Sequence, residues 1–260
     1  RPRFPGGPTP RAGLFPPAGL SMLDAVRNYA AYQRRDDAWA LARFVVPVAR
    51  LAELEHALLE LSEGERLGTR WPLAALAGAD MKAEAAAVES FNARYVHGGP
   101  EVQSLEARVA SPEEVRAIRA VVPPRFELYL EVQLGGALPG LLGAVRQAGA
   151  LAKVRTGGIR AVEIPAPEAI LEFLAEAARA RLPFKATAGL HHPVRGLAPL
   201  TYEPGSACAR LFGYLNVVLA ASVLWHGRSR DDALRLLTAE TRSTLEIGDE
   251  AVVWGGIRIE

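Results

Sequence analysis

Short apolar runs alternate with helical patterns along most of this 260-residue chain. Strands that alternate with helices favour a parallel sheet, because each helix carries the chain back to the edge where the next strand starts. Seven strand candidates fit this pattern, at residues 12–17, 42–47, 71–77, 102–110, 126–133, 152–156 and 184–189. Seven or eight such units predict an α/β fold of the (β/α)8 TIM-barrel type.

The helix candidates carry recognisable start signals. Ser21 begins a Ser-Met-Leu-Asp segment that resembles a capping box, and Ser111 precedes Pro112 and two acidic residues. Further helices are expected at residues 51–61, 81–95, 138–148, 167–181, 209–224 and 231–240.

The eighth strand is the irregular part of the predicted barrel. After residue 192 the pattern becomes a loop and two helices, and residues 246–259 predict a β-hairpin around Gly255-Gly256. We expect a flexible arm at residues 1–10, rich in Pro, Gly and Arg, and a single barrel domain over residues 11–260. The helices and hairpin at residues 205–260 form the end of that domain.

Composition excludes several classes of function. Half of the residues are hydrophobic and the net charge is +1, so the chain can build a large core and offers no excess charge for nucleic acid or an anionic membrane. Cys208 is the only cysteine, which excludes disulfides and cysteine-based zinc sites within one chain. The longest apolar run, residues 215–225, is too short to span a bilayer, and the first residues lack the apolar segment of a secretory signal. We therefore expect a cytoplasmic protein, and the apolar helix at residues 211–224 is as suited to a homo-oligomer interface as to the core.

Barrel enzymes carry their chemistry at the C-terminal ends of the strands. Six polar residues fall on strand candidates: Glu106, Glu131, Lys153, Arg155, Lys185 and Thr187. Side chains alternate along a strand, so Lys153 shares a face with Arg155, and Lys185 shares one with Thr187. Two inward lysines on adjacent strands would depress the pKa of one amine, and a neutral amine is what Schiff-base chemistry needs. The alternative is a buried ion-pair network without catalysis.

The order of these motifs resembles the deoxyribose-phosphate aldolase family over residues 40–190. The resemblance is carried by Lys153-Val-Arg-Thr-Gly157, by Ala166-Pro-Glu168 at a helix start, and by Phe184-Lys185 followed by Gly189. Residues 45–47 resemble the family's Val-Tyr-Pro strand, and residues 126–134 its apolar strand with a Glu.

The resemblance implies a role for each matched residue. Lys153 would form the Schiff base and Lys185 would lower its pKa. Glu106 corresponds to the family's general acid, and Glu131 is a second carboxylate that could move protons. We expect the substrate pocket to be lined by residues of the two motifs and by the histidines that directly follow them, which are not part of the resemblance: Arg155, Thr156, Gly157, Thr187, Gly189, His191 and His192.

Three positions depart from the family pattern. Gly158 follows Thr-Gly where the family often has a polar side chain, Ala188 replaces the first Gly of the second motif, and the late Gly-Ser phosphate segment has only Gly205-Ser206 as a candidate. These departures weaken a phosphate site, so a non-phosphorylated or acidic substrate is equally expected, with Arg155 as a carboxylate clamp.

Three readings of function follow. The first is a class I aldolase-like lyase that acts on a small carbonyl substrate through Lys153, with no cofactor and no stoichiometric metal. The second is a metal-assisted barrel enzyme that uses His191 or His192 with Glu131 and Glu106, although a catalytic zinc site usually needs three protein ligands. The third is a non-catalytic barrel that binds a small acidic ligand through Arg155, Lys153 and Lys185.

Overall fold

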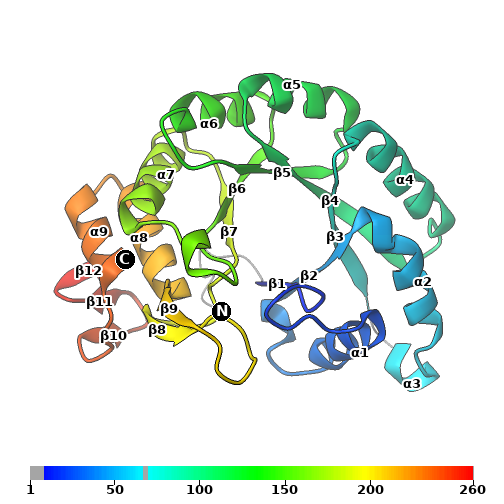
Figure 1. The fold of residues 1–260 in the computed structure, drawn as a ribbon, viewed down its shortest axis with the longest axis horizontal. Coiled ribbons are helices and arrows are strands. Elements are labelled where there is room, and N and C mark those ends of the chain that lie inside the picture. The colour runs from blue at the N-terminus through cyan, green and yellow to red at the C-terminus, as the bar shows by residue number, and fades with distance from the viewer. Residues whose placement is uncertain (1–8, 67–69, 260) are drawn as a thin grey trace. The chain divides into compact units, whose positions relative to one another are not determined.

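The computed structural model describes residues 9–66 and 70–259 and confirms the α/β class (Figure 1). These residues divide into two compact units, which are described separately. The N-terminal unit holds residues 9–109 and 113–130, and the C-terminal unit holds residues 110–112 and 131–259. The prediction of one continuous domain over residues 11–260 stays a prediction.

The N-terminal unit contains a parallel sheet with helices between its strands. Its strands β1, β2, β3 and β4 pair in chain order, each parallel to the one before. Their bounds and those of the intervening helices are β1 Thr9–Arg11, α1 Met22–Gln33, β2 Leu41–Pro47, α2 Leu51–Leu59, α3 Glu63–Arg66, β3 Trp71–Leu76, α4 Met81–Arg94, β4 Pro100–Val109 and α5 Pro112–Val121. Strand β5, Glu127–Val132, runs across the boundary between the units.

Helix α1 covers one face of this sheet. The ring of Tyr29 lies 5.5 Å from that of Phe44 on β2 and 5.2 Å from that of Trp71 on β3, measured between centroids. Ser21 begins α1 as expected, because its hydroxyl oxygen accepts a hydrogen bond from the backbone N–H of Asp24. Residues that alternate with Phe44 and Trp71 therefore point to the opposite face.

In the C-terminal unit, β6 and β7 form a parallel pair and α7 packs on one side of it. The rings of Phe173 on α7 and Phe184 on β7 meet edge to face, with centroids 5.2 Å apart. Figure 1 shows α8 and α9 next to α7, and the three helices pack against one another. The bounds are α6 Leu138–Gln147, β6 Leu151–Arg155, α7 Pro167–Arg179, β7 Phe184–Thr187, β8 Gly196–Pro199, β9 Cys208–Leu211, α8 Tyr214–Trp225 and α9 Arg230–Thr238.

The chain after β7 does not continue as an eighth parallel strand. Strands β8 and β9 pair antiparallel in a separate two-stranded sheet, so the described strands do not close into the expected eight-stranded barrel. The predicted helix at residues 209–224 consequently begins only at Tyr214, since residues 208–211 form β9.

The predicted C-terminal hairpin is confirmed, and a third strand pairs with it. Strands β10 Leu245–Ile247, β11 Val252–Trp254 and β12 Ile257–Ile259 form an antiparallel sheet. Gly255 and Gly256 connect the last two strands with φ values of +54° and +79°, the conformation that a two-residue turn of this kind requires.

The beginning of the chain differs from the prediction. The expected first strand at residues 12–17 is wrong: these residues form turns, and β1 lies just before them at Thr9–Arg11. Of the expected arm, residues 1–8 lie outside the described residues, whereas Thr9 and Pro10 belong to β1. Among the described residues, no helix combines the length and the apolar character needed to cross a membrane.

Candidate active site

The two predicted lysines are register partners. Lys153 on β6 is paired with Lys185 on β7, and Arg155 is paired with Thr187 two residues later. Residues paired in this way point to the same face of a sheet. Phe184 packs against α7, so its neighbour Lys185 points to the face opposite that helix, and Lys153 shares this face. The predicted pairing of the two lysines on adjacent strands is thereby confirmed.

Glu131 lies in direct contact with Lys153. Its Oε2 atom is 2.7 Å from the Nζ atom of Lys153, and the two side chains are only 9% and 10% exposed. A buried ion pair at this distance holds the amine in its charged form unless the proton moves to the carboxylate. This contact supports the alternative of a buried ion-pair network. The negative charge of Glu131 offsets the positive charge that Lys185 brings close to Lys153.

Lysine is rare in this chain, and this rarity is a second sequence signal beside the motifs. Of the 30 basic residues only Lys82, Lys153 and Lys185 are lysines, and the other 27 are arginines. Arginine cannot lose its proton in a protein, whereas lysine can. Two of the three lysines occupy paired positions on one sheet face. This placement is expected in a site where one amine must give up its proton in order to react.

The ends of β6 and β7 are tied together beyond the lysines. Thr156 is fully buried, its N–H donates to the carbonyl oxygen of Thr187 at 2.9 Å, and its hydroxyl donates to that of Ala188 at 2.5 Å. Gly157 and Gly189 touch, because a Cβ atom on either residue would lie 3.1 Å from the Cα atom of the other. These residues fix the spacing of the two strand ends, and their predicted contact with substrate stays a prediction.

The contact with Glu163 explains why residue 158 is glycine, the first departure from the family pattern. The carboxylate of Glu163 accepts hydrogen bonds from the backbone N–H groups of Ile159 and Arg160, and from the guanidinium of Arg160. A Cβ atom on Gly158 would lie 2.1 Å from Glu163 Oε2 and 2.8 Å from Glu163 Cβ. Glycine is the residue that fits beside this side chain, and two backbone donors of the loop, those of Ile159 and Arg160, are already used by a carboxylate of the protein.

Ala188, the second departure from the family pattern, has a backbone conformation that favours glycine. Ala188 has a φ of +66°, inside the left-handed region that favours Gly, and Gly189 follows at +74°. The chain therefore turns after β7 as a Gly-Gly segment would, at the cost of a strained alanine.

The two histidines lie beyond the strand ends and are exposed. Partial burial of the ring lowers the pKa of His191, and the adjacent His192 lowers it further. The carbonyl oxygen of His192 accepts a hydrogen bond from the N–H of Tyr214 at the start of α8. In the part of the chain that the structure describes, no three His, Cys, Asp or Glu side chains gather in a way that could hold a metal ion.

Glu106 belongs to the other unit. It lies near the end of β4, paired in register with Leu76, and is 3% exposed. Its burial agrees with a functional or a structural carboxylate, and its predicted role as general acid stays a prediction.

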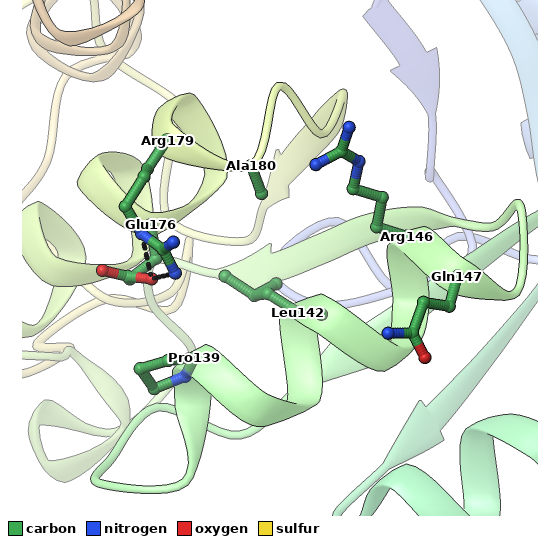
Figure 2. A pocket seen from close by; sticks show the side chains of 8 residues that line it. Pro139, Leu142, Arg146, Gln147, Glu176, Arg179 and Ala180 are labelled. Carbon is green, nitrogen blue, oxygen red and sulfur yellow. Dashed lines mark hydrogen bonds and ion pairs between the residues drawn. The ribbon is translucent and has the colours of Figure 1, made fainter.

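The pocket in Figure 2 is not the lysine site. It has a volume of about 360 Å³ and lies between α6 and α7, where Leu142, Arg146 and Gln147 face Glu176 and Arg179. Glu176 and Arg179 pair with each other at 2.5 Å, as the dashed lines show. Helix α7 covers the Phe184 face of β7, so this pocket is on the side of the strands that faces away from Lys185.

No protein-family model, curated protein or solved structure matches this chain. The resemblance to deoxyribose-phosphate aldolases stays a prediction that rests on the motifs around Lys153 and Lys185.

Proposed function

We propose that the chain is a lysine Schiff-base enzyme, an aldolase-like lyase that acts on a small carbonyl substrate at Lys153. The observation that carries the proposal is the pairing of Lys153 with Lys185 on one sheet face, in a chain that otherwise uses arginine for nearly all of its basic residues. An arginine in either place would supply the same charge and could not lose a proton.

The Glu131 carboxylate can act as the proton acceptor for Lys153. At 2.7 Å it is placed to take a proton from the ammonium group, which leaves a neutral amine and a neutral acid. The transfer removes both charges of a buried pair and leaves Lys153 as a nucleophilic amine.

The neutral amine then attacks the carbonyl carbon of the substrate and forms a carbinolamine. Protonated Glu131 gives its proton to the departing hydroxyl, so that water leaves and a protonated imine remains. The bond between the α and β carbons then breaks: Glu131 takes the proton of the β hydroxyl, the first product leaves as an aldehyde or ketone, and the electron pair of the broken bond forms an enamine on Lys153. Glu131 returns the proton to the α carbon, and addition of water to the resulting protonated imine releases the second product from Lys153.

Borohydride trapping tests this function directly. The protein is incubated with small aldehydes, ketones and 2-oxo acids, reduced with borohydride, and mapped by peptide mass spectrometry. With only three lysines the adduct is easy to assign. We expect it at Lys153, absent in Lys153→Met and weaker in Lys185→Leu, whereas Lys82→Met, a change at an exposed helix position, leaves it unaltered. A folded protein that gives no adduct with any carbonyl would refute the proposal.

Binding of a small acidic ligand without catalysis is the second candidate. The direct ion pair between Lys153 and Glu131 favours it, because a lysine held as an ammonium group by a carboxylate cannot form an imine. Lys185 and Arg155 lie on the same face and add positive charge. Calorimetry with pyruvate and with lactate separates the two candidates, since lactate lacks the carbonyl. Equal affinities support ligand binding alone, and a clear preference for pyruvate supports the Schiff base.

A further inference from the structure

The pocket between α6 and α7 (Figure 2), here the α6–α7 pocket, contains an arginine without a counter-charge. The guanidinium of Arg146 has no ion pair and no hydrogen bond in the part of the chain that the structure describes. Figure 2 shows it extending from α6 toward Ala180 on α7. The other arginine of the pocket, Arg179, is paired with Glu176 at 2.5 Å. One positive charge in the pocket is therefore available to a ligand.

The rest of the lining is largely apolar and leaves space open. Pro139, Leu142 and Ala180 line the α6–α7 pocket together with Gly143. A Cβ atom on Gly143 would meet nothing within 4 Å, so the space beside this residue holds no protein atoms. The volume of about 360 Å³ lies in the range of small-molecule sites. An apolar group of a ligand placed here would leave water for an apolar surface.

The charges around the pocket disfavour a second negative charge on the ligand. Arg146 and Arg179 lie in the last turns of α6 and α7, where the partial charge of a helix is negative. Glu176 lines the same pocket and adds a carboxylate. A single carboxylate matches one available guanidinium, which can hold both of its oxygens with two parallel hydrogen bonds.

We propose that the α6–α7 pocket binds a small monocarboxylate with an apolar body, such as an aromatic acid. The carboxylate accepts hydrogen bonds from Arg146, and the apolar body lies against Leu142 in the space beside Gly143. This site shares no residue with the lysine site and lies on the α7 side of the strands, away from Lys185. It is therefore independent of the Schiff-base proposal.

Three probes test the chemistry of the ligand by NMR titration. Benzoate has the carboxylate and the apolar body, benzamide has the same shape without the charge, and inorganic phosphate has the charge without the apolar body. We expect saturable binding of benzoate, about tenfold or more tighter than that of either other probe, because a hydrogen bond to a charged group exceeds a neutral one. Added salt should weaken it. No saturable benzoate binding, or benzamide binding of equal affinity, would overturn the proposal.

A charge variant tests the role of Arg146. Arg146→Gln keeps a long polar side chain at an exposed helix position and should weaken benzoate binding about tenfold or more. Arg242→Gln removes the same charge from an exposed position of the same unit outside the pocket and should leave the affinity unaltered. Equal losses in the two variants would show a general effect of net charge and would contradict the site.

A matched pair of glycine variants tests the location. Gly143→Leu places a side chain in the open space and should abolish benzoate binding, whereas Gly140→Leu makes the same change one turn earlier on α6, outside the pocket, and should not. Both variants should fold, since a Cβ atom at either position meets nothing within 4 Å. Benzoate held at the lysine face instead would bind Gly143→Leu and Arg146→Gln as tightly as wild type, and that result would also overturn the proposal.

Discussion

The Nζ atom of Lys153 lies 2.7 Å from Oε2 of Glu131, and neither side chain is more than 10% exposed. Removing one member of a buried ion pair leaves the other charge without its nearest counter-charge, which is usually far more costly than removing both. The pair therefore makes a prediction about stability that does not depend on catalysis.

We expect Glu131→Gln and Lys153→Met each to lower the free energy of unfolding by roughly 3–5 kcal/mol. The double variant Glu131→Gln/Lys153→Met should recover most of this loss, because no buried charge of the pair remains. Urea denaturation of the four proteins measures the coupling between the two residues. Additive losses in the double variant would show that the two side chains do not act as a pair.

Gly158→Ala should destabilise the protein by about 1–3 kcal/mol, because the new methyl group would collide with Glu163. Shortening Glu163 to alanine in the same chain should relieve part of this loss. Gly140 on α6 is a matched control, since a Cβ atom there meets nothing within 4 Å. Gly140→Ala is expected to stabilise its helix by about 0.5–1 kcal/mol. Equal effects at positions 158 and 140 in urea denaturation would contradict the collision.

Ala188→Gly should stabilise the protein by roughly 1 kcal/mol, since glycine adopts a φ of +66° without the steric cost that alanine carries. Gly189→Ala should do the opposite, because its φ is +74° and a Cβ atom there would approach Gly157 to 3.1 Å. Thermal unfolding of both variants gives the comparison. A loss of stability in Ala188→Gly would mean that the methyl group makes contacts that outweigh the strain.

His191 should make the protein less stable in mild acid. Its pKa in the folded protein is lowered by partial burial and then by His192, so the unfolded chain binds a proton more readily. Stability is therefore lost as the pH falls through the usual histidine range near 6.5, and the loss ends below the folded pKa. We expect His191→Gln to flatten the fall in unfolding free energy between pH 7 and pH 5. His97→Gln, at an exposed position of the N-terminal unit, serves as the control and should keep the slope.

The sequence predicted the regular part of the fold well. Six of the expected strands lie within two residues of β2 to β7 because they are apolar runs with clear helix signals between them. The first strand was wrong because Phe15-Pro-Pro17 is apolar but forms turns, and proline removes a donor that a strand needs. Strands β8 and β9 were missed because residues 196–211 carry little alternation and are held by pairing with each other.

The candidate site was predicted only in part. Side-chain parity on two strands was enough to place Lys153 and Lys185 on a common face, because the period of two is a local property. The ion pair with Glu131 belongs to the buried network that was weighed as the alternative, but which carboxylate contacts Lys153 depends on a neighbouring strand and on side-chain reach, which no local pattern encodes. The role of Glu163 was not predicted, because it depends on the path of a loop, and Gly158 is the sequence feature that this contact explains.

The register of β6 against β7 determines where the chain can accept insertions or deletions without separating the two lysines. One residue inserted into or deleted from the middle of either strand would turn one lysine to the α7 side while the other kept its place. Insertions in the connection between these strands, residues 158–183, would leave the pairing intact if they spared Glu163 and the buried face of α7. Homologous chains that keep the chemistry should therefore vary in length between the two strands and hold constant the number of residues from Lys153 to Gly157 and from Lys185 to Gly189.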